Sequence, residues 1–229
     1  MTITPNLLTR AAAVAAVAAG AIFIGVNINH PHLDVESITT TDVVVRSSLK
    51  MLMGVLALVG ITGMYLRQVR QTGVLGLLGY VVLGTGYVVI TCVTFTAAYV
   101  MPSIAGTDPS YVGDVVAATT GRPFTGDIGL LQGVLRVQDL GYLLGGLIFG
   151  IALYRARVLA RWAAALLAVG GVVTIALAVM PDAFYRFLAF PNGIAMIGLG
   201  CSLWSVARAD SAVEVATLAE RRTATAGAE

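Results

Sequence analysis

Arg136 and Asp139 are the residues best placed to do chemistry, because they are opposite charges in an otherwise apolar stretch. The stretch from 128 to 154 is predicted to span a membrane as a helix, on which Gln132, Arg136 and Asp139 share one stripe. An ionised side chain at bilayer depth costs about 2.5–3.5 kcal/mol and usually faces protein or a wet cavity. We therefore expect these three residues to form the polar floor of an intramembrane pocket. A purely structural Arg136–Asp139 ion pair is the alternative.

Three further polar residues are candidates for the same pocket. Arg46 and Lys50 follow Asp42 at spacings of four and eight residues in a predicted helix, and either line the mouth of the pocket or extend to the membrane interface. Asn192 lies in the turn that opens the last predicted span, where it either caps that helix or reaches the pocket. The predicted ligand-binding set is therefore Gln132, Arg136, Asp139, Arg46, Lys50 and Asn192.

One outer loop contains a pattern that could bind a metal ion. His30, His32, Asp34 and Glu36 alternate along the chain, so an extended backbone would present them on one side. Imidazole and carboxylate ligands suit zinc or copper, which makes His30 and His32 candidate ligands. A polar loop beside a membrane explains the same pattern without a metal. We expect no cofactor.

The elements that must position these residues are apolar helices. The 229 residues are 58% hydrophobic and 11% charged, with a mean hydropathy of +0.88. Six stretches are long enough to cross a hydrocarbon core, for which about 17–25 residues are needed. The sequence predicts an all-α, six-transmembrane-helix bundle over residues 1–207, followed by a cytoplasmic tail at 208–229. The predicted spans are 11–28, 43–66, 74–101, 128–154, 162–180 and 191–207, the first being a retained helix.

Charge placement predicts the orientation of the bundle. One set of helix ends carries Arg10, Arg67, Arg70, Arg155, Arg157, Arg161, Arg208, Arg221 and Arg222, whereas the opposite loops carry most of the acidic residues. Cytoplasmic loops are enriched in Lys and Arg, so both termini are predicted to be cytoplasmic. A long outer loop at 102–127 contains an apolar segment, 111–120, that is predicted to form a short interfacial helix or a lid.

The segment from Gly141 to Ala168 resembles a family of bacterial six-helix membrane proteins of unknown function. The resemblance rests on Leu153-Tyr154-Arg155 followed by Leu159-Ala160-Arg161-Trp162, a basic turn between two spans. It implies a compact helical bundle in a bacterial-type plasma membrane, and it implies no activity and no site residues.

Glycines in the fourth span predict close helix packing. Gly141 and Gly145 lie opposite Gly146 and Gly150, so this helix is expected to be buried by protein on two faces. Two predicted helical hairpins resemble each other: spans 43–66 and 74–101, and spans 128–154 and 162–180. In each hairpin a Tyr lies near the first Arg of the turn and the second span ends at Met-Pro. This pattern is either an internal repeat or a common feature of membrane hairpins.

The leading functional hypothesis is a non-enzymatic membrane protein that binds a small amphiphile in an outward-opening pocket, with membrane lipids as its surroundings. One alternative is a membrane enzyme acting on an isoprenoid or lipid, with Asp139 as general acid. Another is an accessory subunit that packs against a membrane partner through faces containing Gly141. No Walker loop, His-Glu-x-x-His motif or nucleophile elbow is present, and no basic groove suggests nucleic acid.

Overall fold

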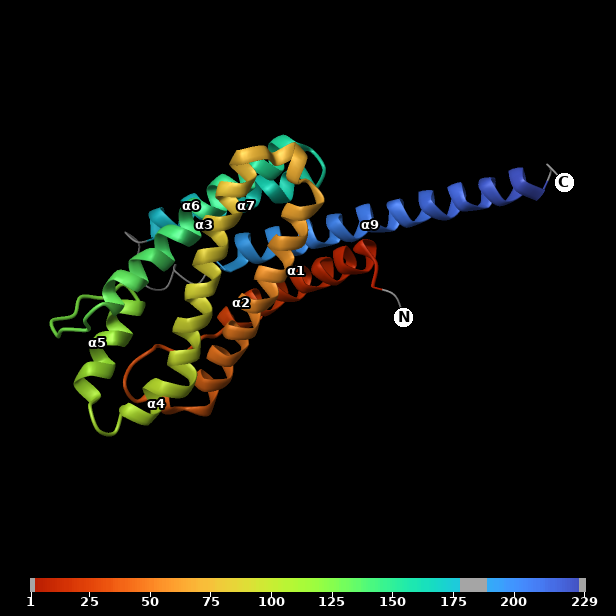
Figure 1. Cartoon of the computed structure of the whole chain (residues 1–229). Helices are drawn as coiled ribbons and strands as arrows, with labels where there is room; N and C mark the ends of the chain where they lie inside the picture. Colours follow the sequence, from red (N-terminus) through yellow and green to blue (C-terminus); the bar gives the residue numbers. More distant parts are fainter. Residues whose placement is uncertain (1–2, 178–188, 227–229) are drawn as a thin grey trace.

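The computed structural model describes residues 3–177 and 189–226, and in this part of the chain the regular structure is helical throughout. The long helices are α1 (Pro5–Asn27), α2 (Thr41–Arg67), α3 (Val69–Phe95), α6 (Leu131–Ala156), α7 (Arg161–Leu177) and α9 (Ala189–Ala226). The shorter elements are η1 (Ser37–Thr39), the π-helical turn η2 (Thr96–Val100), α4 (Met101–Ile104) and α5 (Pro109–Thr119). The expectation of an all-helical fold is confirmed (Figure 1).

Local sequence signals explain where the helices begin. The side chain of Thr4 accepts a hydrogen bond from the Leu7 N–H at the start of α1, and the Thr40 side chain caps α2 in the same way. Asp108 accepts from the Tyr111 N–H at 3.0 Å and precedes Pro109, so α5 has both an acidic N-cap and a proline in its first turn. The predicted short helix at 111–120 therefore exists as α5.

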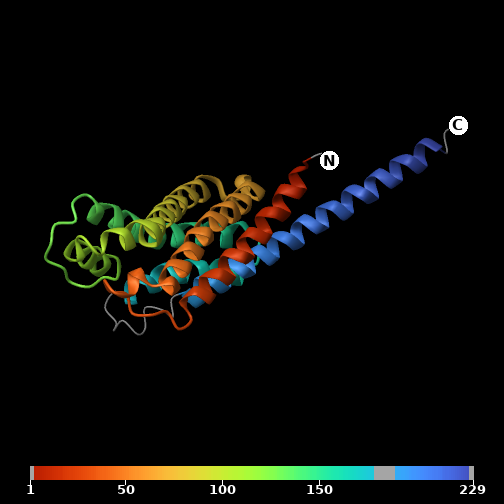
Figure 2. The ribbon, with the colours of Figure 1, turned by 90° about the horizontal axis from the view of Figure 1, so that it is seen from below.

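The six long helices form a closed ring in which each helix packs against its two neighbours, in the order α1, α2, α3, α6, α7 and α9. The pairing of contacts shows that neighbours are antiparallel: Gly60 meets Ala16, Gly54 meets Thr91, and Asn6 bonds to Ala207. Figures 1 and 2 both show α1 and α9 side by side, with the two termini on the same side of the molecule. The ring therefore joins the first and last helices of the chain directly.

Close backbone contacts hold α6 on two faces. A Cβ added at Gly141 would lie 3.1 Å from the Gly86 Cα of α3, and one at Gly145 would overlap the Leu83 backbone of the same helix. On the other face, a Cβ at Gly150 would lie 2.6 Å from the Ala168 N of α7. The predicted two-face burial of α6 is confirmed. Gly141 packs inside the chain and is therefore not available to a partner protein.

The ring contains two apolar clusters. The main cluster fills its interior and includes Ala57, Ile61, Leu83, Phe149, Leu153, Leu199 and Leu203. A second cluster lies under η1, α4 and α5 and comprises Ile38, Met101, Ala105, Val112, Val115, Val116, Ile128 and Leu135. This second cluster forms a small cap on the end of the bundle away from the α2–α3 turn (Figure 1).

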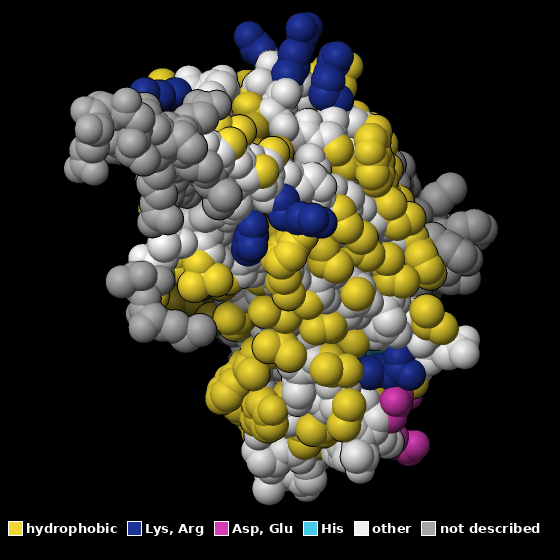
Figure 3. Space-filling model, turned by 90° about the vertical axis from the view of Figure 1, so that its right-hand side faces the viewer, with side chains coloured by type: hydrophobic (Ala, Val, Ile, Leu, Met, Phe, Trp, Pro, Cys, Tyr) yellow, Lys and Arg dark blue, Asp and Glu magenta, His cyan; other side chains and the backbone are white. Residues whose placement is uncertain are grey.

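Five of the described helices are long and apolar enough to cross a membrane: Pro5–Asn27, Thr41–Arg67, Val69–Ile104, Leu131–Ala156 and Phe190–Val213. The fifth predicted span, 162–180, corresponds to α7, of which Arg161–Val172 counts as a shorter apolar helix, and residues 178–180 lie outside the described part. Met180-Pro181 of the possible repeat also lies outside it. The face seen in Figure 3 is largely hydrophobic. Lys and Arg side chains stand at one end, in the middle of the face, and beside the acidic side chains near the other end.

Two further boundaries of the helices differ from those of the predicted spans. The structure continues the last predicted span without a break, so that 208–226 belongs to α9 and extends away from the bundle (Figure 2). The α2–α3 connection is helical from Val69, yet Gly73 has φ +55° and ψ −148°, which breaks the helix there. The continuous part of α3 thus begins near the predicted position, residue 74.

Candidate functional site

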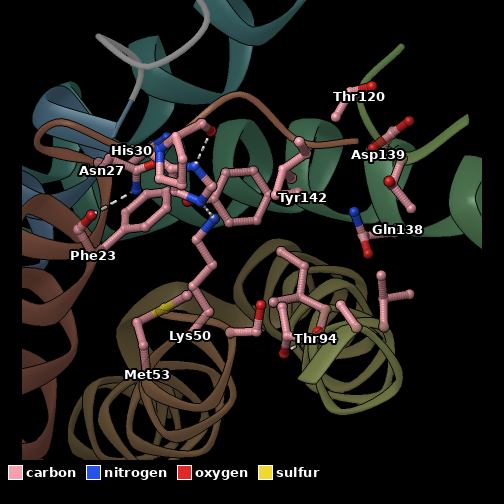
Figure 4. A pocket seen from close by; sticks show the side chains of 18 of the residues that line it. Phe23, Asn27, His30, Lys50, Met53, Thr94, Thr120, Gln138, Asp139 and Tyr142 are labelled. Carbon is pink, nitrogen blue, oxygen red and sulfur yellow. Dashed lines mark hydrogen bonds between the residues drawn. The ribbon is translucent and has the colours of Figure 1, made fainter. Parts of the chain in front are cut away.

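A cavity of about 300 Å³ opens at the capped end of the ring. Its walls come from the C-terminal end of α1, the outer half of α2, the end of α3 with η2, the loop after α5, α6 and the start of α9. A water molecule occupies about 30 Å³ in the liquid, so the space suits one small molecule or a headgroup rather than a whole lipid. Figure 4 shows the side chains that line it.

Lys50 and His30 form the basic wall of the cavity. The Lys50 Nζ lies 3.0 Å from the His30 Nε2, and the His30 Nδ1 lies 2.9 Å from the carbonyl oxygen of Pro31. An ammonium group can only donate, so the His30 Nε2 accepts and its Nδ1–H donates to Pro31. Because His30 is buried, its orientation is fixed, and it holds the Lys50 ammonium at the cavity.

Asp139 and Gln138 form the acceptor wall on α6, across the cavity from Lys50 (Figure 4). Asp139 interacts with the side chain of Gln138. The described residues give it no ion-pair partner within 4.0 Å, and the Oε1 of Gln138 is buried without a hydrogen-bond partner. An ionised carboxylate can only accept hydrogen bonds, so Asp139 makes this wall favour a ligand that donates.

The floor of the cavity is apolar and aromatic. Tyr142 lies one turn of α6 from Asp139, and its ring meets the rings of Phe23 and Tyr87 edge to face, with centroids 6.5 and 5.6 Å apart. The remaining apolar lining comes from Met53, Ile90, Val93 and Ala97. Phe23, Met53, Tyr87, Ile90 and Tyr142 also belong to the main apolar cluster, so the floor is continuous with the bundle interior.

Arg122 joins the two outer loops at the rim. Its Nε donates to the Thr120 Oγ1 at 2.9 Å, its Nη1 lies 3.0 Å from the His32 Nε2, and its Nη2 donates to the Leu33 carbonyl. Because Thr120 follows α5 and Leu33 precedes α2, one side chain holds the cap against the loop after α1.

Only half of the predicted ligand-binding residues line this cavity. Lys50, Asp139 and Asn192 are part of its lining, whereas Gln132, Arg136 and Arg46 are not. The sequence pattern therefore placed Gln132, Arg136 and Arg46 in a pocket that they do not line.

Of the predicted pair, Asp139 lines the cavity and Arg136 does not. Both side chains are exposed, and no ion pair joins them in the described structure. The predicted helix began at 128, but α6 begins at Leu131, so Arg136 lies only about 7.5 Å inside the helix end and Asp139 about 12 Å. A long arginine side chain reaches the polar boundary from that depth, so it needs no internal partner.

Arg46 stabilises the end of α1 instead of lining the pocket mouth. Its Nη1 donates to the Val26 and Ile28 carbonyls at 3.0 and 2.9 Å, and its Nε pairs with Asp42 at 2.9 Å. The last carbonyls of a helix lack partners within the helix, so this arginine satisfies two of them from the next helix.

The two histidines are placed for hydrogen bonding rather than for metal ligation. Lys50 bonds to the Nε2 of His30 and Arg122 to the Nε2 of His32, and Asp34 turns back to accept from the Ser37 N–H at 2.7 Å. Among the described residues no group of three or more His, Cys, Asp or Glu side chains could hold a metal ion.

Sequence reasoning missed several lining residues: Asn27, Ser47, Arg122, Gln138 and Tyr142. Two signals were present in the sequence. Gln138 and Tyr142 are four residues apart on the helix that already contained Asp139, and Arg122 is one of few basic residues in the outer loops. The contact of Arg122 with His32 joins residues 90 positions apart, which no local pattern encodes.

Comparison with known proteins adds no assignment: no family model matches the chain, and neither a curated protein nor a solved structure matches it. The likeness of the Leu153–Trp162 turn to a bacterial membrane family therefore remains a resemblance of one short segment.

Proposed function

We propose that this chain is an integral membrane protein of a bacterial-type plasma membrane, crossing six times with both termini in the cytoplasm, and that it binds a small amphiphile in an outward-opening cavity. The observation that carries the proposal is the cavity at the capped end of the ring, lined by Lys50 on one wall and Asp139 on the other over an apolar floor. Binding sites for small molecules combine apolar walls with a few placed polar groups in this way.

The orientation rests on the charge distribution at the other end of the ring. The turns after α2 and α6 carry Arg67, Arg70, Arg155 and Arg157, and Arg67 pairs with Asp210 on α9 at 2.8 Å. Because this basic end is favoured on the cytoplasmic side, the cavity opens toward the outside.

Ligand binding is tested with the purified protein in detergent, using lauric acid, dodecylamine and lysophospholipids as probes in a thermal-shift titration. We expect at least one probe to raise the Tm of the wild type and to lose this effect in Ala97→Phe, which fills the cavity wall. Val81→Phe places the same ring on the exposed face of α3 and is the matched control. Equal shifts in all three proteins would exclude binding in the cavity.

Orientation is tested by cysteine labelling in intact cells, after Cys92 and Cys201 have been replaced by alanine. A cysteine at Thr107 should react with a membrane-impermeant maleimide from outside, and one at Arg157 should react only after lysis. The reverse pattern would show that the cavity opens to the cytoplasm.

One observation supports the alternative function, a membrane enzyme acting on a lipid or isoprenoid: Asp139 lies in the cavity. Turnover of an added lipid or isoprenoid that is abolished in Asp139→Asn, with binding retained, would favour that function over simple binding.

A further inference from the structure

The two walls of the cavity differ in charge, and this difference narrows the ligand class of the proposed binding function, on which the present inference rests. The α2 wall offers a donor, the Lys50 ammonium oriented by His30. The α6 wall offers an acceptor, the Asp139 carboxylate, which interacts with the side chain of Gln138. A ligand that satisfies both walls needs an acidic group at one end of its polar part and an N–H donor at the other.

We infer that the cavity binds a zwitterion with a primary ammonium and a carboxylate or phosphate: the ammonium at Asp139, the acid at Lys50, and apolar carbons over Phe23 and Met53. This chemistry is shared by free amino acids with apolar side chains and by the headgroup of aminophospholipids.

Charge balance disfavours the simpler ligands. With neutral histidines, Lys50, Arg122 and Asp139 give the lining a net charge of +1. A plain cationic amine would meet Asp139 but be repelled by Lys50, and a plain acid would pair with Lys50 but be repelled by the Asp139 carboxylate. A zwitterion adds no net charge and offers each of these two side chains a group of opposite charge.

Aromatic rings form the floor between the two walls. Tyr142 lies one helical turn from Asp139, and its ring is held by Phe23 and Tyr87. These rings give the apolar carbons of the ligand a surface to pack on.

The size of the cavity limits what enters. About 300 Å³ accommodates an amino acid or a phospholipid headgroup with the first atoms of its chain, so the acyl chain of a lipid ligand would remain outside.

The first experiment compares lysophosphatidylethanolamine, lysophosphatidylcholine, lysophosphatidylglycerol and free leucine, each added to the purified protein and measured by native mass spectrometry and thermal shift. We expect lysophosphatidylethanolamine to bind about tenfold more tightly than lysophosphatidylcholine, because a quaternary ammonium has no N–H to donate. Binding of leucine but not of the lysolipid would identify the free amino acid as the source of the zwitterion, and the opposite result would identify the lipid headgroup.

The second experiment uses variants to measure the contribution of each cavity wall to ligand binding. Asp139→Asn and Gln138→Leu should each weaken the preferred zwitterion about tenfold while leaving lysophosphatidylglycerol unchanged. Lys50→Met should weaken both zwitterion and lysophosphatidylglycerol by a similar factor. Arg136→Gln is the control, because it removes a charge from the same helix outside the cavity and should change nothing.

The outcomes distinguish this inference from the proposed function. Equal affinity for the ethanolamine and choline lipids, or no change in Asp139→Asn and Gln138→Leu with Tm retained, would overturn the zwitterion while leaving amphiphile binding intact. If no probe binds in the cavity at all, both fail.

Discussion

The ammonium of Lys50 and the Nε2 of the buried His30 are 3.0 Å apart, so the lysine reaches the cavity as part of a chain that ends at the Pro31 carbonyl. His30 thus connects the loop after α1 to α2 at the binding wall. Its effect on the ligand is indirect, because it orients the group that makes the contact.

His30→Ala should therefore weaken an acidic or zwitterionic ligand by roughly three- to tenfold, since an unheld lysine loses rotamer entropy on binding. His30→Gln, which offers a side-chain oxygen acceptor, should recover part of this loss. Titration by thermal shift or native mass spectrometry measures both. Identical affinities in the wild type and His30→Ala would show that Lys50 needs no orienting partner.

Arg46→Ala should lower stability by about 1–3 kcal/mol, because two carbonyls at the end of α1 lose a charged donor. Asp42→Asn removes only the partly exposed ion pair and should cost less than about 1 kcal/mol. Urea unfolding in detergent, followed by circular dichroism, gives both values. A larger effect in Asp42→Asn would mean that the ion pair, not the carbonyl contact, matters.

Gly145→Ala and Gly133→Ala form a matched pair on α6. The first should destabilise by about 1–3 kcal/mol or more, since its Cβ overlaps the Leu83 backbone. The second meets nothing within 4 Å and should be neutral or stabilising by about 0.5–1 kcal/mol, because alanine favours the helix. The Tm of each variant, measured at one detergent concentration, compares the two stabilities. A stable Gly145→Ala would contradict the close α3–α6 contact.

Arg122→Ala should loosen the rim without unfolding the bundle. Its three bonds tie the segment after α5 to His32 and Leu33, so both outer loops should exchange amide hydrogens faster while α2 and α6 stay protected. Arg122→Lys keeps the charge but not the three-way contact, and should show most of the same increase. Unchanged exchange at 31–35 would show that Arg122 does not hold this segment.

The turn at Asp34 should weaken in acid. The Ser37 backbone N–H, followed by its side chain, lowers the pKa of the exposed Asp34 carboxyl below its usual value of 3.8. A lowered folded-state pKa contributes stability above the unfolded-state pKa, and this contribution is lost as pH falls through the folded-state pKa. Limited proteolysis at 30–40 should therefore accelerate below about pH 4. Asp34→Asn should remove this pH dependence.

Local patterns were sufficient to predict the helices. Apolar runs located the ends of most spans to within a few residues, and the two glycine faces of α6 were predicted because a 100° repeat fixes which residues share a face. The tail was expected to be a solvated helix, but its unbroken continuation from the last span as α9 was not predicted.

The site was harder to predict, because burial depends on which helix lies opposite. Asp139 and Lys50 were found from their charges, yet Arg136 and Arg46 carry the same signal and have other positions: one is exposed near the start of α6 and the other bonds to the end of α1. His30 was considered as a metal ligand because it alternates with His32, Asp34 and Glu36. Its contact with Lys50, 20 residues away, follows no local pattern and was not predicted.

The closure of the ring between α1 and α9 has a consequence for biosynthesis. Asn6 of α1 bonds to Ser211 of α9, 205 residues later. Small residues of α1 contact both neighbouring helices: Ala12 and Ala16 lie against α2, and Gly20 lies against α9. At about 5–20 residues per second, the ribosome needs roughly 10–40 s to deliver the second partner after the first helix has emerged. During that interval the nascent chain presents one unmatched face to lipid or to insertion factors, and only its last hydrophobic segment completes assembly.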